Sequence, residues 1–569
     1  MTQQETIIHQ QFDFFLQKQI NFERDMDHSN KQLNGIYLTS DSYIIDTILD
    51  SIIDDSIIFS KTFLEPSCGH GIFIIKLILK AFSINDDEKL IANFIENNLY
   101  FADIDQKMLE EVEKNILELY FCLFNNNYTG KFNSYCVDFT RMMDDDFSIE
   151  KDTIFTLYNK IDYLIGNPPY ISLYGRRDKK NNEEQREYYL KHYRQFPSTL
   201  KNGKINFVML FIEHSLKFLK TNGKLSFIID LAFFETAYMH CRKFIVENYT
   251  INSLIYNFRH FDNVGSGQII LEICNTLPIN NTVKVTDYQN ETTTYIEQES
   301  WNRSDDEYKF RISHCKNSDE IIEKIFAKKD PTLKQLYPHK NLRTCAMLLD
   351  MEEQFVKKVP ATTLKSYPYY RGSSGLKYKY SKFHYEKFFY YDKALQDEIN
   401  DKLKEELTLK GIKNKKRIGM GEIEVYDNPK LYIRQSAKEL IASYDHNPSA
   451  ANNSLYVFTL RDNSQESINT LKYLCGLINS ILYTFFAQQR RIIRYNQGKQ
   501  PQIKVSDLYQ LHIPQSKVLE NKIVDIVNRI YNDYSSAQQL KNAIDKLVYE
   551  YYGITVEEQN LIAESIQSF

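Results

Sequence analysis

Short apolar segments alternate with longer helical segments between Gly35 and Asn275, and this alternation constrains the fold more than any other feature of the chain. Residues 62–65 predict a buried strand, which a turn at residues 66–71 and an apolar helix at residues 72–82 follow. Repetition of this unit predicts a parallel, doubly wound α/β sheet that binds ligands at the carboxyl ends of its strands. Polar residues directly after predicted strands are therefore the first candidates for a functional site.

The same alternation predicts the other elements of this part of the chain. A second helix is expected at residues 108–124, and an inserted helical loop is expected at residues 83–98. Further strands are predicted at residues 99–103, 134–137, 162–165, 225–229, 254–258 and 269–274.

The most informative strand end is Asn167-Pro168-Pro169-Tyr170, which follows the apolar run at residues 161–166. Neither proline has a backbone N–H, so the turn is rigid and its carbonyls remain available as acceptors. An amide oxygen, a carbonyl and a flat ring form a receptor for a planar group with an exocyclic amine. An adenine extruded from a double helix is such a group. A turn that only ends a strand is the alternative interpretation.

Three other predicted strands also end in residues suited to ligands. Gly69 and Gly71 allow the backbone to approach a ligand at a helix start, although a tight turn alone explains them equally well. Asp103 can accept hydrogen bonds from both hydroxyls of a ribose, or it can cap a helix. Asp138 can accept from an adenine amino group, and Phe139 can cover the ring.

In this order the four strand ends resemble those of S-adenosylmethionine-dependent amino methyltransferases of DNA. They resemble in particular the gamma-class N6-adenine enzymes similar to the TaqI methyltransferase. Residues 35–40 are similar to the family's Gly-x-x-x-Thr-Pro motif, with Ser40 in place of the proline. Residues 261–265 are similar to the loop whose aromatic residue stacks on the flipped base. The resemblance extends over roughly residues 30–300.

The resemblance implies S-adenosylmethionine as the methyl donor, S-adenosylhomocysteine as the product and no metal. It assigns the catalytic corner to Asn167, Pro168, Pro169 and Tyr170, and base stacking to Tyr170 and Phe261. The cofactor contacts that it implies are Tyr37, Thr39, Glu65, Pro66, Ser67, Gly69, Gly71, Asp103, Ile104, Asp138, Phe139 and Asn167.

The second half of the chain contains a basic segment, although the formal net charge of the chain is -5. Residues 357–438 contain 19 Lys and Arg against 10 Asp and Glu, and residues 367–391 interleave this charge with tyrosines. Such a pattern predicts contacts with DNA, while a solvated charged surface is the alternative. The DNA-binding candidates, for which phosphate contact is expected ahead of base readout, are Arg371, Lys377, Lys379, Arg434, Arg490, Arg491 and Arg494.

These observations predict a Rossmann-like methyltransferase domain, an α+β target-recognition domain and a helical C-terminal segment. We expect an N-terminal extension at residues 1–29, the catalytic domain at 30–300, the target-recognition domain at 301–515 and the helical segment at 516–569. Residues 276–345 are rich in Asn, Thr and acidic residues, which predicts surface loops and a hinge.

Composition indicates the cell compartment in which the protein is expected to act. The eight cysteines form no CxxC pair, which argues against structural zinc and favours a reduced intracellular protein. We see no signal peptide and no apolar run that reaches the length of a membrane span, so we expect a bacterial cytoplasmic protein. Only 34 residues precede Gly35, too few for a nuclease fold.

The expected function is therefore methylation of adenine N6 in double-stranded DNA by a monomer. The chain is expected to be solitary or paired with a separate restriction endonuclease. Asn-Pro-Pro-Tyr also serves methylation of RNA and of protein glutamine, so both remain alternatives. A catalytically silent DNA-binding subunit is a further alternative.

Overall fold

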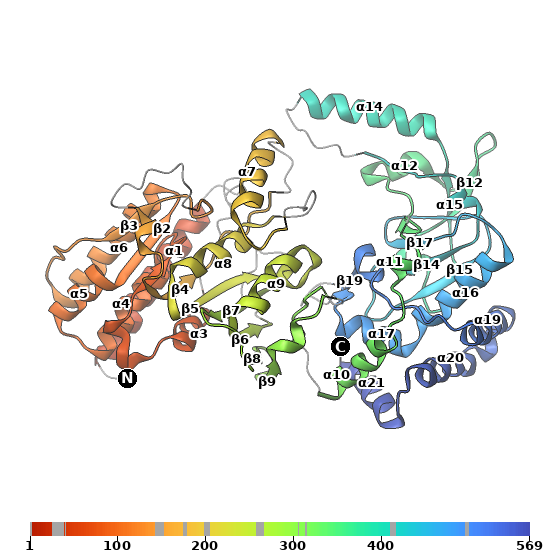
Figure 1. Ribbon diagram of the computed structural model, residues 1–569. Coiled ribbons are helices and arrows are strands. Elements are labelled where there is room, and N and C mark those ends of the chain that lie inside the picture. The colour runs from red at the N-terminus through yellow and green to blue at the C-terminus, as the bar shows by residue number, and fades with distance from the viewer. Residues whose placement is uncertain are drawn as a thin grey trace. The chain divides into compact units, whose positions relative to one another are not determined.

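The structure is a computed structural model, and Figure 1 shows its ribbon. It divides into two compact units, unit 1 (Met1–Phe310) and unit 2 (Arg311–Phe569). The described residues are 3–25, 39, 41–142, 153–173, 179–197, 205–257, 267–304, 307–312, 316–338, 340–409, 417–494 and 500–568.

The described residues of unit 1 form a nine-stranded sheet of order β3-β2-β1-β4-β5-β7-β6-β8-β9. The five strands from β3 to β5 are parallel, whereas β7 is antiparallel to both of its neighbours. The strands are β1 (Phe63–Glu65), β2 (Leu99–Asp103), β3 (Asn133–Cys136), β4 (Ile161–Gly166), β5 (Leu219–Asp230), β6 (Thr250–Tyr256), β7 (Gln268–Cys274), β8 (Thr282–Asp287) and β9 (Thr292–Glu297).

Helices surround this sheet (Figure 1). The helices α1, α3, α4, α5 and α6 share one hydrophobic core with β1 and β2, whereas α8 packs against β5 and α9 against β6. The α-helices are α1 (Gln3–Asp25), α3 (Ser42–Ile52), α4 (Ile72–Ile84), α5 (Glu88–Asn98), α6 (Gln106–Phe124), α7 (Lys179–His192), α8 (Phe207–Phe218) and α9 (Met239–Asn248). Short 3-10 helices are η1 (Asp55–Ser60), η2 (Ile154–Leu157), η3 (Leu231–Phe234), η4 (Thr236–Tyr238) and η5 (Gln298–Trp301).

The predicted mixed α/β fold is confirmed, and each predicted strand of this region is present. The helical insertion at residues 83–98 is also confirmed, because α5 occupies most of it. Residues 254–258 match β6 only as far as Tyr256, since Phe258 lies outside the described residues.

Two expectations for unit 1 were wrong. The sheet is mixed, because β7 pairs with β5 and β6 as an antiparallel strand. Residues 276–345 are not loops throughout, because β8 and β9 extend the sheet and α10 enters the core of unit 2, and a hinge within this range stays a prediction. Strand β9 is polar and yet regular, because it lies at the edge of the sheet and only Ile296 of its six residues is buried.

The described part of unit 2 contains two four-stranded sheets, β10-β17-β14-β15 and β11-β13-β12-β16, and the pair β18-β19. The strands are β10 (Leu342–Thr344), β11 (Val356–Lys357), β12 (Ser366–Tyr370), β13 (Lys387–Tyr390), β14 (Lys430–Arg434), β15 (Ala442–Asp445), β16 (Ala450–Ala451), β17 (Leu455–Phe458), β18 (Ile493–Arg494) and β19 (Gln502–Ile503).

Helices make up the remainder of unit 2. Short ones are α11 (Leu333–Leu336), η7 (Leu349–Met351), α12 (Glu352–Phe355), α13 (Gly372–Gly375), α15 (Glu424–Asp427), α18 (Val505–Leu508) and η8 (Tyr534–Ser536). Longer ones are α10 (Lys316–Ala327), α14 (Lys393–Leu409), α16 (Gln465–Asn479), α17 (Ile481–Gln489), α19 (Lys517–Asn532), α20 (Ala537–Tyr552) and α21 (Val556–Ser568).

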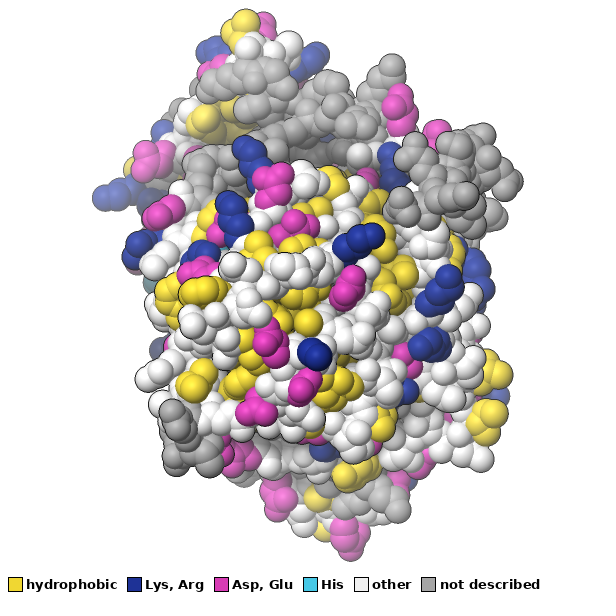
Figure 2. All heavy atoms as spheres, turned by 90° about the vertical axis from the view of Figure 1, so that its left-hand side faces the viewer, with side chains coloured by type: hydrophobic (Ala, Val, Ile, Leu, Met, Phe, Trp, Pro, Cys, Tyr) yellow, Lys and Arg dark blue, Asp and Glu magenta, His cyan; other side chains and the backbone are white. Residues whose placement is uncertain are grey.

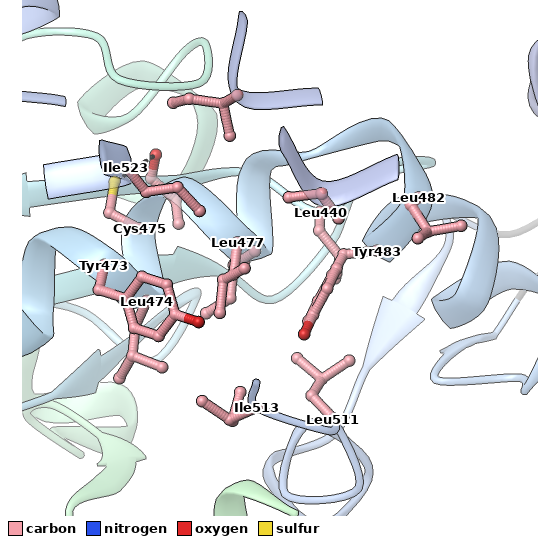
Figure 3. Packing of buried hydrophobic residues seen from close by; sticks show 14 of the residues in the cluster. Leu440, Tyr473, Leu474, Cys475, Leu477, Leu482, Tyr483, Leu511, Ile513 and Ile523 are labelled. Atoms are coloured by element: carbon pink, nitrogen blue, oxygen red, sulfur yellow. Dashed lines mark hydrogen bonds between the residues drawn. The ribbon is translucent and has the colours of Figure 1, made fainter. Parts of the chain in front are cut away.

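The C-terminal helices belong to the largest core of unit 2 (Figure 3). Helices α16 and α19 approach closely at Gly476, where an added Cβ would lie 2.3 Å from the Ile523 side chain. Tyr473 and Tyr483 are buried in the same core, and their hydroxyls donate to the carbonyls of Pro514 and His512. The helical end of the chain is thus a packed part of unit 2.

One side of unit 1 carries charges of both signs. Figure 2 shows basic and acidic side chains interspersed with hydrophobic ones on the side that lies to the left in Figure 1. Among the residues coloured there, neither sign of charge forms a broad patch. In the part of the chain that the structure describes, none of the helices combines the length and apolar character needed to span a bilayer.

Candidate functional site

The glycine turn after β1 has the backbone geometry that its sequence predicts. Gly71 precedes α4 with φ +81° and Gly69 has φ +50°, both in the left-handed region that glycine tolerates best. A Cβ at Gly71 would lie 2.8 Å from a methyl group of Val112 on α6. The N–H of Cys68 donates to the Ala102 carbonyl at 2.9 Å, which fixes the turn against the end of β2. The turn is therefore a tight cradle between α4 and α6.

Asp103, at the end of β2, faces this turn. Its carboxylate accepts hydrogen bonds from the backbone N–H groups of Gly69 at 2.9 Å and Asp105 at 3.0 Å. Burial raises the pKa of Asp103 above its ordinary value, although these two hydrogen bonds oppose the shift. The helix cap that was the alternative role of Asp103 belongs to Asp105, which precedes α6. Ile104 is 71% exposed beside the carboxylate.

Glu65 ends β1 with its carboxyl group buried. The residue is 2% exposed, and burial followed by the charge of Asp103 raises the pKa of Glu65 well above its usual range. One oxygen, Oε2, has no hydrogen-bond partner among the described residues. Its side chain lies close to Gly166, where an added Cβ would be 3.5 Å from the Glu65 Cγ. An orphaned buried carboxyl oxygen is an acceptor that a bound ligand can use.

Asn167 joins three segments that are far apart in the sequence. The Ser67 hydroxyl donates to the Asn167 backbone carbonyl at 3.3 Å. The side-chain Nδ2 of Asn167 donates to the hydroxyl of Thr39 at 3.3 Å, and Thr39 is buried. The predicted catalytic corner and the predicted cofactor turn are thus in direct contact in unit 1.

Tyr170 is anchored at its hydroxyl while the residue as a whole is partly exposed. The hydroxyl donates to the Ile228 carbonyl of the neighbouring strand β5 at 3.2 Å. Burial, followed by the nearby charge of Asp230, raises the pKa of this hydroxyl well above its ordinary value. The backbone after the corner is also fixed, because the Phe207 N–H donates to the Ile171 carbonyl at 2.9 Å. The ring is therefore held in one orientation.

Asp138 and Phe139 follow β3. The Asp138 carboxylate accepts from the Thr140 backbone N–H at 2.9 Å and from its hydroxyl at 2.6 Å. The Phe139 ring is 3% exposed and stacks on Phe218 with centroids 5.3 Å apart. This packing gives Phe139 a role in the core, and its contact with a cofactor stays a prediction.

For the remaining expected site residues, the structure gives either a degree of burial or no description. Tyr37 and Phe261, together with Gly35 and Ser40, lie outside the described residues. Pro66 and Pro168 are buried and Pro169 is partly exposed.

Arg242 on α9 supports the loop after β5, and the sequence analysis missed it. Its guanidinium is fully buried and donates to the backbone carbonyls of Phe233, Glu235, Glu307 and Tyr308. Burial lowers the pKa of Arg242 to about 10, so the group remains charged at neutral pH. A single arginine in an amphipathic helix gives no sequence signal for this role, because such residues are usually on the surface.

In unit 2, the exposed DNA-binding candidates are Arg371 and Lys377. The Lys377 ammonium lies 5.2 Å from the ring centre of Tyr378, which is 58% exposed. Arg371 forms an ion pair with Glu352 at 3.2 Å, but its side chain remains 54% exposed. A cation next to an exposed ring is a surface suited to a nucleic acid.

The other basic candidates make contacts within unit 2. Lys379 pairs with Glu439 at 2.6 Å, and Arg434 donates to a backbone carbonyl at 2.8 Å. Arg494 pairs at 2.6 Å with Asp507, whose side chain is 1% exposed. Arg490 is 5% exposed over the Phe326 ring. Arg490 is buried, whereas Lys379, Arg434 and Arg494 are partly exposed, and the role of all four as phosphate contacts stays a prediction.

Arg491 is the last of the DNA-binding candidates. It is partly exposed, and its backbone has φ +52° one residue beyond the C-cap of α17. Its role as a phosphate contact stays a prediction.

The strand order, the glycine turn after β1 and the acid at the end of β2 define the class: unit 1 has the fold of an S-adenosylmethionine-dependent methyltransferase. Residues 75–262 match the sequence model of the Eco57I restriction-modification methylase. Residues 367–513 match that of the TaqI-like C-terminal specificity domain. The chain thus contains a restriction-modification methylase region followed by a TaqI-like specificity region. A search of curated proteins gives no match.

Solved structures are similar over most of the chain. The type IIL restriction-modification enzyme MmeI in complex with DNA is 12% identical, with a TM-score of 0.51 and coverage of 92% of this chain and 74% of MmeI. The DrdV–DNA complex is 13% identical, with a TM-score of 0.51 and coverage of 92% and 60%. The type IIG restriction endonuclease BpuSI is 14% identical, with a TM-score of 0.39 and coverage of 90% and 66%. This chain therefore spans less than two thirds of the length of DrdV and BpuSI.

Proposed function

We propose that this protein transfers a methyl group from S-adenosylmethionine to N6 of an adenine that is extruded from double-stranded DNA. The observation that carries the proposal is the contact of the Asn167 corner with the glycine turn, through the Ser67 hydroxyl, and with the separate segment at Thr39, through its hydroxyl. An acceptor set for an amine and a cradle for a nucleoside thus adjoin at the ends of β1 and β4.

The residues of the cradle fit S-adenosylmethionine. Gly69 and Gly71 form the left-handed turn at the start of α4, and the fixed Asp103 carboxylate matches the two hydroxyls of a ribose. The orphaned Oε2 of Glu65 matches the ammonium of the methionine part. The 71% exposed side chain of Ile104 offers an apolar surface for the adenine ring. When bound, the donor supplies a methyl group on a positively charged sulfur.

Asn167 and Pro168 would act on the adenine amine by accepting its two hydrogens. The lone pair of this nitrogen is delocalised into the ring, so the free amine is a poor nucleophile. Two acceptors, the Asn167 amide oxygen and the Pro168 carbonyl, favour a tetrahedral nitrogen whose lone pair is localised. Positioning and electrostatics then supply most of the rate, and a strong general base is not needed.

Base stacking is the proposed role of Tyr170 and Phe261. Extrusion of a base costs a few kcal/mol of stacking and pairing, which an aromatic sandwich offsets. The hydrogen bond from Tyr170 to the Ile228 carbonyl supports this role, because it holds the ring in one orientation before the base arrives. After methyl transfer, the amine nitrogen carries one surplus proton, which can leave to solvent.

Unit 2 is the proposed reader of the DNA sequence. The match to a TaqI-like specificity domain supports this role, and the exposed Lys377 and Tyr378 are candidates for the contact. We propose that the protein is the modification part of a restriction-modification system, with a separate endonuclease, or a solitary methyltransferase. Monomeric action in a bacterial cytoplasm is part of the same proposal.

The test is transfer of a tritiated methyl group to DNA that carries no prior methylation, followed by nucleoside analysis. We expect N6-methyladenine as the product, and Asn167→Ala should lower the rate constant by about 100-fold or more, as the loss of a preorganised hydrogen-bonding group does elsewhere. Asn97→Ala, at an exposed asparagine of α5, is the matched control and should retain the wild-type rate.

The same assay separates the alternatives. Label in tRNA or in a release-factor glutamine, with none in DNA, would replace the proposed substrate. Label at a cytosine would retain DNA as the substrate, but it would contradict the proposal that adenine N6 is the methylated atom. Binding of DNA without any transfer would make the protein a silent subunit.

A further inference from the structure

Helix α1 carries a polar residue on its buried side. Phe12, Phe15 and Leu16 form an apolar stripe at helical spacing, and Gln19 continues it one turn later. Gln19 is 1% exposed, although packing alone would favour an apolar side chain at this position. A buried amide costs free energy unless it is hydrogen-bonded, so the hydrogen-bond partner of Gln19 indicates why a glutamine occupies this position.

The partner of Gln19 is the candidate cofactor segment. Its Nε2 donates to the backbone carbonyl of Thr39 at 2.6 Å, in a buried contact. The Thr39 hydroxyl in turn accepts from the Asn167 side chain at 3.3 Å. A chain of two hydrogen bonds therefore runs from α1 through Thr39 to the amide of the catalytic corner.

The same two turns of α1 also contact the glycine turn. The Phe22 ring lies 4.9 Å from the ring of His70, the residue between Gly69 and Gly71. Lys18 donates to the Asn115 side chain at 2.6 Å, and Asn115 donates to the His70 carbonyl at 3.1 Å. Helix α1 thus contacts both sides of the candidate cofactor site. It precedes the segment that matches the methylase family, residues 75–262.

We propose that Gln19 is a positioning residue for methyl transfer. It holds the Thr39 backbone so that the Thr39 hydroxyl orients the Asn167 amide, whose oxygen then faces the adenine amine. The catalytic half of this inference rests on the proposed function, whereas the hold on Thr39 also concerns binding of the methyl donor. Residues 1–29, taken from the sequence as an extension, would then include a part of the active site.

Gln19→Leu is the informative substitution, because leucine continues the apolar stripe and removes the amide that donates to Thr39. We expect the Kd for S-adenosylmethionine, measured by calorimetry, to rise about tenfold. The single-turnover rate at saturating donor should fall about tenfold, with the KM for DNA unchanged. Gln17→Leu, at an exposed glutamine of the same helix, is the matched control and should change neither quantity.

A double substitution separates positioning from a general structural role. Thr39→Val removes the acceptor for Asn167, so Gln19→Leu should add little in the Thr39→Val background if both act through one chain. Full additivity, or a Gln19→Leu variant with a lower melting temperature but unchanged Kd and rate, overturns the inference. If the wild-type protein methylates no DNA, the proposed function is wrong. The Kd of Gln19→Leu for S-adenosylmethionine would still decide whether α1 holds the cofactor segment at Thr39.

Discussion

Replacing Gly71 with alanine should destabilise unit 1 through two separate effects. The backbone at Gly71 has φ +81° and ψ 23°, a left-handed conformation that costs roughly 1–2 kcal/mol for a residue with a Cβ. The new Cβ would also lie 2.8 and 2.9 Å from the two methyl groups of Val112, which is fully buried. Overlap of this kind in a packed core costs about 1–3 kcal/mol. The two effects together predict a loss of roughly 2–5 kcal/mol.

The two effects can be separated at Val112. Val112→Ala alone removes two methyl groups, at about 0.8 kcal/mol each plus a term for the cavity. In the double variant the overlap disappears, and the Cβ introduced at position 71 occupies part of the cavity. The double variant should therefore be more stable than the sum of the single changes predicts, by about 1–3 kcal/mol.

The assay is urea unfolding followed by tryptophan fluorescence. The chain has a single tryptophan, Trp301, which is buried in unit 1 and stacks on Phe310 with centroids 4.4 Å apart. The signal therefore reports the unit that contains the substitutions. Additivity of the two single changes within about 0.5 kcal/mol would refute the proposed overlap. Left-handed strain alone would then account for the effect of Gly71→Ala.

Three further predictions concern the site and unit 2. Because the folded-state pKa of Glu65 is raised, the protonated form is favoured in the fold, so the free energy of unfolding should fall as pH rises above about 4.3. Glu65→Gln should flatten this part of the stability–pH curve for the ligand-free protein, and an unchanged slope would contradict the argument. Tyr170→Phe should lower the methyl-transfer rate about tenfold without changing the affinity for S-adenosylmethionine, because it removes the hydrogen bond to the Ile228 carbonyl that holds the ring. An unaltered rate would show that this hydrogen bond does not orient the ring for catalysis. Lys377→Ala should reduce the salt dependence of DNA binding by about 0.9 in log–log slope. Arg494→Ala should instead cost about 3–5 kcal/mol of stability by removing the ion pair with the buried Asp507, and the reverse pattern would exchange the roles of the two residues.

Local chemistry explains how much of unit 1 the sequence predicts. Strand period, glycine turns and di-proline corners are properties of short segments, and each predicted strand of the methyltransferase sheet is present. The order of strand ends then brings Ser67 and Asn167 together, because parallel strands deliver their carboxyl ends to one edge of a sheet. The roles of the candidate residues in binding and catalysis remain predictions that the experiments above address.

Pairing over long distances along the chain is what the tertiary structure alone decided. The antiparallel insertion of β7 and the extension by β8 and β9 depend on which strand edges meet, and local periodicity does not encode this. Arg494 is part of a basic run in the sequence, but in the fold it neutralises the buried Asp507. Gln19 is an ordinary polar residue of a helix until Thr39, twenty positions later, takes its hydrogen bond. A side chain's charge and shape are written in the sequence, whereas its partner, and hence its availability to a ligand, is set only when distant segments pack.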